Sequence, residues 1–180
     1  MLRITIPATE QFNEVPNEFI TTKEQTLTLE HSLISISKWE SKWCKSFVNS
    51  KNKTTEETLD YVRCMTLTSN VNPEVYYCLT QKNIEEINAY IDAPMTATVF
   101  NDMGNNGGPK ETITSELIYY WMIACNIPWE CEKWHFNRLI TLIRVCNIKN
   151  TPPKKMSKRD IMSRNAALNA ARRQQMNSRG

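Results

Sequence analysis

The chain has 180 residues, of which 41% are hydrophobic and 23% charged, a composition typical of one soluble globular domain with its own core. Its longest uninterrupted apolar run, residues 117–125, is nine residues long, which excludes a membrane-spanning helix of about 20 residues. The start of the sequence lacks a cationic segment followed by a long apolar stretch, so we expect no secretory signal and a cytoplasmic location. The net charge of +3 divides into −5 for residues 1–148 and +8 for residues 149–180, where nine cations face one carboxylate. We therefore expect a globular domain at 1–148 and a basic tail at 149–180.

The N-terminal segment shows the period of a half-buried strand. Residues 2–6 alternate between apolar and polar side chains, and Pro7 ends the run. A second alternating run covers residues 26–29. Together the two runs predict a small β hairpin within residues 1–29.

Helical spacing begins directly after this β element. Apolar residues between 29 and 47 predict a helix that starts near Glu30 and ends in the aromatic segment around Trp39 and Trp43. Later helix starts are marked by residues able to cap an N-terminus, namely Thr54 with Glu57, Asn72 before Pro73, and Thr80.

The stretch from 95 to 111 is less regular. Residues 95–100 are short, apolar and β-branched enough for either a strand or a helical turn. Residues 101–111 hold three of the four glycines, which predicts a flexible surface loop that tolerates insertion. Its GGPKET run lacks the glycine spacing and the Lys-Ser/Thr ending of a phosphate-binding loop.

Residues 113–148 gather most of the large apolar and aromatic side chains into two helical patterns joined at Pro128. The first is apolar nearly all round, so we expect it to lie centrally with Trp121 in the core. The second is amphipathic and should be half exposed. The predicted fold is mainly α, a single-domain helical bundle around this central hairpin, with the N-terminal β hairpin and a basic C-terminal helical tail.

The tail should form one last helix. Ser157 and Asp160 make a capping pattern, and the helix should run to about Gln175. Ile161 and Leu168 give it only a weak apolar seam, so it is too polar to be core and should form fully only against a partner.

The chemistry-bearing residues favour packing over catalysis. Cys131 and His135 are four apart on one helix face, a spacing that lets two side chains share a metal, and Cys125, Cys146 or His31 could complete a zinc site. However, the sequence has no C-x-x-C pair, and cysteines on apolar stripes are usually buried thiols. Adjacent carboxylates fall at helix starts or on solvated faces. We therefore expect reduced thiols, no metal, no cofactor and no enzymatic activity.

The basic tail has two interpretations. Its cations should be drawn to polyanions. A nucleic-acid arm would favour interleaved aromatic residues for stacking, and residues 149–180 contain none. A protein-binding arm would dock on an acidic partner, including the acidic body of a neighbouring copy.

Four stretches of the sequence carry a resemblance: TLTLEHSLISISKWESKW, MTATVF, ITSELIYYWMIACNIPWECEKWHFNRLITLIRVCNIKN and PPKKMSKRDIMSRNAALNAARR. They resemble small proteins of long-tailed bacteriophages and are similar to tail assembly chaperones, which are encoded between the tail tube and tape measure genes. The resemblance covers nearly the whole chain. It implies a non-enzymatic helper in the host cytoplasm that coats the long helical tape measure protein before tail tube subunits polymerise around it. The tail tube protein is then a further candidate partner, and no catalytic residues are implied.

A soluble helper of this kind needs an accessible groove or helix face to cover apolar stripes. The candidates for such a surface are Trp39, Trp43, Trp129 and Trp134. Each of them, taken singly, more often packs in or beside a core. The competing function is a virion connector or minor capsid protein whose basic tail contacts DNA or a neighbouring subunit. A small DNA-binding regulator would need a helix-turn-helix pattern, and none is evident. The candidate partner-binding residues are Trp39, Trp43, Trp129, Trp134, Ile161, Leu168, Lys154, Lys155, Lys158, Arg159, Arg172 and Arg173.

Overall fold

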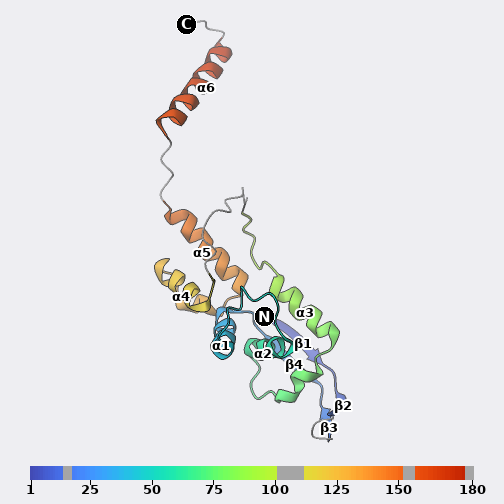
Figure 1. The fold of residues 1–180 in the computed structure, drawn as a ribbon. Coiled ribbons are helices and arrows are strands. Elements are labelled where there is room, and N and C mark those ends of the chain that lie inside the picture. Colours follow the sequence, from blue (N-terminus) through green and yellow to red (C-terminus); the bar gives the residue numbers. More distant parts are fainter. Residues whose placement is uncertain (14–17, 101–111, 152–156, 177–180) are drawn as a thin grey trace. The chain divides into compact units, whose positions relative to one another are not determined.

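The computed structural model describes residues 1–13, 18–100, 112–151 and 157–176, and Figure 1 shows its fold. The expected loop at 101–111 lies outside these residues. The fold is mainly helical with a small antiparallel N-terminal β element, as predicted. Two compact units, Met1–Asn147 and Ile148–Gly180, divide the chain. The elements are β1 Leu2–Ile6, β2 Thr9–Asn13, β3 Glu18–Thr22, β4 Gln25–Leu29, α1 Leu33–Trp43, α2 Thr55–Met65, the 3-10 helix η1 Pro73–Cys78, α3 Gln81–Asp92, α4 Ser115–Ala124, the 3-10 helix η2 Trp129–Lys133, α5 Phe136–Asn150 and α6 Lys158–Met176.

The β element consists of two antiparallel strand pairs, β1 with β4 and β2 with β3. β1 pairs with β4 so that Ile4 faces Leu27, and β2 pairs with β3 further along the same connection. Ile4, Ile6, Leu27 and Leu29 are all buried, because alternate residues of a strand point to one face. The alternating pattern thus identified β1 and β4, whereas the polar connection between them hid β2 and β3.

Helix α1 occupies the centre of the core. Its side chains Leu33, Ile36 and Trp39 are fully buried, and it packs against α2, α4 and η2. The Trp39 indole Nε1 donates to the Glu57 carbonyl at 2.8 Å, so even its polar atom is satisfied inside the protein. The helix begins at the Ser32 cap and ends where Cys44 adopts a left-handed conformation with φ of 51°.

The expectation that α4 lies centrally, with Trp121 in the core, is wrong. Of its ten residues only Ser115, Ile118 and Met122 are buried, and Trp121 is half-buried. A helix with no polar face still has an outer side when it packs at the edge of a domain, and hydrophobic periodicity cannot identify that side. The second helix of the hairpin begins later than Pro128, since η2 forms a separate turn before α5.

The local start signals that the sequence predicts are present. Thr54 and Glu57 form a reciprocal capping box, with the Glu57 amide donating to Thr54 Oγ1 at 3.2 Å and the Thr54 amide donating to Glu57 Oε2 at 2.8 Å. Thr80 caps α3 in the same way. Residues 94–100 form neither a helix nor a strand.

Three hydrogen-bonding side chains fix the start of α4. The buried Glu40 carboxylate accepts from the Phe47 amide through Oε1 and from the Ser115 amide through Oε2, each at 2.7 Å. The hydroxyl of Ser46 donates to the Ile113 carbonyl, and the Ile113 amide donates to the side chain of Asn49. Residues distant in sequence therefore position α4 on the end of α1.

The C-terminal unit contains α6. Ser157 caps it, since the Asp160 amide donates to Ser157 Oγ at 3.1 Å and that hydroxyl donates to the Asp160 carboxylate at 2.7 Å. All nineteen residues of α6 are exposed. None of the helices in the described ranges combines the length and apolar composition needed to cross a lipid bilayer.

Candidate protein-binding surface

Three large apolar side chains are exposed on α4 and η2. Tyr120, Ile123 and Trp129 have exposed fractions of 63%, 61% and 55%, and we call these three residues the α4–η2 surface. Tyr120 and Ile123 are three apart and therefore neighbours on one helix face. Together they expose on the order of 300 Å² of mostly apolar area, a size at which patches on monomeric proteins are often functional.

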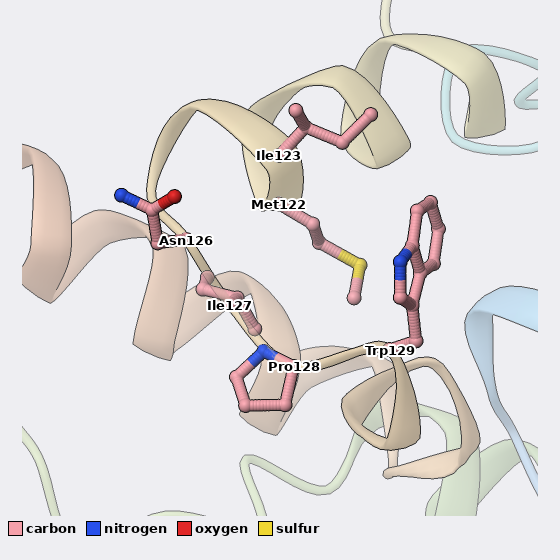
Figure 2. A pocket seen from close by; sticks show the side chains of 6 residues that line it. All are labelled: Met122, Ile123, Asn126, Ile127, Pro128 and Trp129. Carbon is pink, nitrogen blue, oxygen red and sulfur yellow. The ribbon is translucent and has the colours of Figure 1, made fainter.

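A cleft opens beside this surface. It has a volume of about 320 Å³ and is lined by Met122, Ile123, Asn126, Ile127, Pro128 and Trp129. Figure 2 shows the Met122 thioether pointing toward the Trp129 indole, so the two side chains form adjoining walls. This volume is at the lower end of the range for small-molecule sites. Its open, apolar shape suits one or two side chains inserted from another protein.

The chain forms this cleft because α4 ends abruptly. Asn126 takes a left-handed conformation with φ of 52°, which an asparagine tolerates better than most residues. The Ile127 amide then returns to the Met122 carbonyl at 2.9 Å, and Pro128 directs the chain into η2. As a result Trp129, the first residue of η2, lies beside the last turns of α4.

The Trp129 ring is held in place before any partner arrives. It packs against Tyr119 with ring centroids 5.7 Å apart, and the Tyr119 hydroxyl donates to the Glu132 carboxylate at 2.9 Å. Burial, followed by the hydrogen bond to Glu132 and then the Glu132 charge, raises the pKa of Tyr119, which keeps the phenol protonated as a donor. Pre-organised aromatic side chains lose little conformational entropy on binding, which makes them effective anchors at protein interfaces.

The two elements that form the α4–η2 surface carry more carboxylates than cations. Glu116 lies four residues before Tyr120 and so on the same helix face, and Glu130 and Glu132 belong to η2. Hydrogen bonds from its own backbone amide and from Thr114 hold the pKa of Glu116 below its ordinary value. Helix α4 contains no cation, and η2 contains only Lys133.

The structure separates the four predicted tryptophans. Trp39 is fully buried, so the prediction that it binds a partner is wrong. Trp43 is half-buried and donates from Nε1 to Asp60 Oδ2 at 3.0 Å. Trp134 is half-buried with the Arg138 guanidinium 4.0 Å from its ring centroid. Trp129 alone of the four is classed as exposed.

Sequence reasoning missed Tyr120 and Ile123. Both were assigned to a central helix, because α4 shows no polar stripe that would mark an outer face. One signal was available, namely that Glu116, Tyr120 and Ile123 recur at four and three residues, so a carboxylate shares their side of the helix.

The predicted tail residues fall in two groups. Ile161 and Leu168 are exposed and lie one heptad apart on α6, and Lys158, Arg159, Arg172 and Arg173 are exposed on the same helix. Lys154 and Lys155 lie outside the described residues.

The two histidines of the chain lie together in the core. Their ring centroids are 5.1 Å apart, and both side chains are buried. Burial, together with the neighbouring His135, lowers the pKa of His31 to about 3, while burial raises the pKa of the Cys131 thiol. The six cysteines all lie in the described ranges, and none of them forms a disulfide there. Within the described ranges, no three His, Cys, Asp or Glu side chains are grouped as a metal site would require.

Comparisons of this chain with protein-family models, with curated proteins and with solved structures find no match.

Proposed function

We propose that this protein is a non-enzymatic tail assembly chaperone of a long-tailed bacteriophage, which binds the tape measure protein through the α4–η2 surface. The observation that carries the proposal is the exposure of Tyr120, Ile123 and Trp129 beside an open apolar cleft. An exposed patch of this kind favours a protein-binding role. The sequence resemblance supplies the identity of the partner.

The proposed mode of binding is a helix laid into a groove. A long helical protein with apolar stripes presents side chains at intervals of three and four residues, and such side chains anchor helices in apolar grooves. The cleft would take one anchor between Met122 and Trp129, and Tyr120 would cover the next. While covered, the stripe could not associate with other apolar surfaces.

Co-expression with the tape measure protein tests this proposal. Ile123→Asp combined with Trp129→Ala should abolish capture in a pull-down, because the change places a charge beside the cleft and removes one of its walls. Leu67→Asp is the matched control, since Leu67 is exposed but lies outside the α4–η2 surface. Both variants should unfold close to the wild-type temperature. Capture of the tape measure protein by the double variant at the wild-type level would refute the proposed surface.

Substitutions in the basic tail distinguish the chaperone function from the virion connector function. The observation that supports a connector is the set of exposed cations on α6, which could contact DNA. If the tail also docks on the tape measure protein, Ile161→Asp with Leu168→Asp should weaken that association, because apolar burial supplies affinity that charge alone does not. Duplex DNA should then bind only weakly at physiological salt. Strong, salt-sensitive DNA binding that survives the double substitution would favour the connector.

A further inference from the structure

We infer that helix α6 of one copy docks on the α4–η2 surface of a second copy, so that the chain self-associates when its assembly partner is absent. The inference rests on the proposed function in one respect, that this surface binds an apolar helix. Its test uses this chain alone, so the two proposals can fail separately.

The apolar features of the two surfaces are complementary. Ile161 and Leu168 are seven residues apart, which places them about 10 Å apart on one side of α6. The cleft has room for one of these side chains, and the exposed Tyr120 ring offers a flat apolar area for the other. Docking of α6 on the α4–η2 surface of a second copy would cover both apolar features at once.

The charges are complementary as well. The sequence of α6 contains five cations and one carboxylate. Helices α4 and η2 themselves carry Glu116, Glu130 and Glu132 against Lys133, with Arg138 of α5 close to Cys131 of η2. Opposite signs on facing surfaces accelerate encounter and select orientation. The same charges would repel two copies of α6 from each other, which disfavours a helix pair built from two tails.

The physical state of α6 also favours docking. It is a nineteen-residue helix with every residue exposed, and in proteins most helical stability comes from tertiary packing of an apolar face. Docking on another chain would supply those contacts. Because tail and surface are different parts of the molecule, the contact is heterologous, and it joins copies head to tail or by mutual exchange of tails.

Sedimentation equilibrium of the full chain tests the inference. The mass of the wild type should rise with concentration above the 20.9 kDa of one chain, and higher salt should weaken the association. A tail variant, Ile161→Asp with Leu168→Asp, and a surface variant, Ile123→Asp with Trp129→Ala, should each remain monomeric. Met162→Asp is the matched control, because Met162 is exposed but lies about 100° around the helix from Ile161. This control should associate as the wild type does.

Mixing the two defective variants gives the decisive result. The tail variant keeps an intact surface and the surface variant keeps an intact tail, so a mixture should form a heterodimer of about 42 kDa, twice the mass of one chain. A monomeric wild type up to about 0.5 mM would overturn the inference, because even a contact with a Kd near 1 mM would be detected there. Association that persists in either variant, or a mixture that stays monomeric, would also overturn it. A mixture that pairs while the tape measure protein ignores the surface would leave self-association standing and remove the proposed function.

Discussion

Mild acid should destabilise this protein through His31. The side chain is 2% exposed, and its Nδ1 lies 2.5 Å from the Tyr61 hydroxyl, with the His135 ring on another side. Burial first, and His135 second, lower its pKa from 6.5 to about 3. The folded protein therefore keeps His31 neutral at pH values where the unfolded chain binds a proton. This contribution to stability is complete above pH 6.5 and is lost progressively as the pH falls toward 3.

The magnitude follows from these two pKa values. Between pH 7.5 and pH 5.5 the linkage relation gives a loss of about 1.4 kcal/mol from this one histidine. Few carboxylates with ordinary pKa values titrate in that range, so the histidine contribution is separated from general acid denaturation. Urea denaturation at both pH values measures it. Replacing His31 with Asn should lower stability at pH 7.5 yet remove about 1.4 kcal/mol of the pH dependence.

Tyr61→Phe is the control for this experiment. It deletes the hydroxyl beside His31 but leaves the imidazole buried, and burial is the larger cause of the lowered pKa. This variant should therefore be less stable than the wild type and just as sensitive to pH. If the His31→Asn variant and the wild type lost the same free energy between the two pH values, the linkage argument would be refuted.

Three further outcomes are expected. Trp39→Ala should lower the free energy of unfolding, measured by urea denaturation, by about 3–5 kcal/mol. Trp121→Ala, at a half-buried position, should lower it by about 1–2 kcal/mol. Equal losses would contradict the assigned core. Glu40→Gln should cost about 1–3 kcal/mol, since an amide cannot accept from two backbone donors through two oxygens, and an unchanged thermal midpoint would argue against that bridge. A thiol reagent should label Cys44 first and Cys78 slowly in the native protein, because Cys44 is exposed and Cys78 is buried, and mass spectrometry of partly labelled protein would reveal a reversed order.

Local patterns in the sequence were sufficient for much of the fold. The alternation of residues 2–6 identified β1, and the Thr54 and Glu57 pair identified the start of α2, since both signals act over a few residues. The centre of the core could not be inferred in this way. Helices α1 and α4 both carry tryptophans at apolar positions, and only tertiary packing determines that Trp39 is fully buried while Trp121 is half-buried.

The candidate site was predicted in part. Trp129 was one of the four candidate tryptophans, and it is exposed beside the cleft. Trp39 and Trp43 are four residues apart on one helix and both donate to α2, yet Trp39 is fully buried and Trp43 is half-buried. Exposure of Tyr120 and Ile123 depends on where α4 packs, a property that the sequence of α4 does not contain.

The attachment of α4 has a consequence for how the domain could be divided. Glu40 binds the Ser115 amide, and the segment after α1 binds both backbone groups of Ile113. These bonds between described residues fix the start of α4 against the end of α1. A chain cut between residues 100 and 112 would yield two fragments. One would carry the side chains that make these hydrogen bonds, and the other would carry the backbone groups of Ile113 and Ser115 that they bind. Their reassembly would then depend on fragment concentration, because cutting the chain turns an intramolecular contact into an association of two molecules.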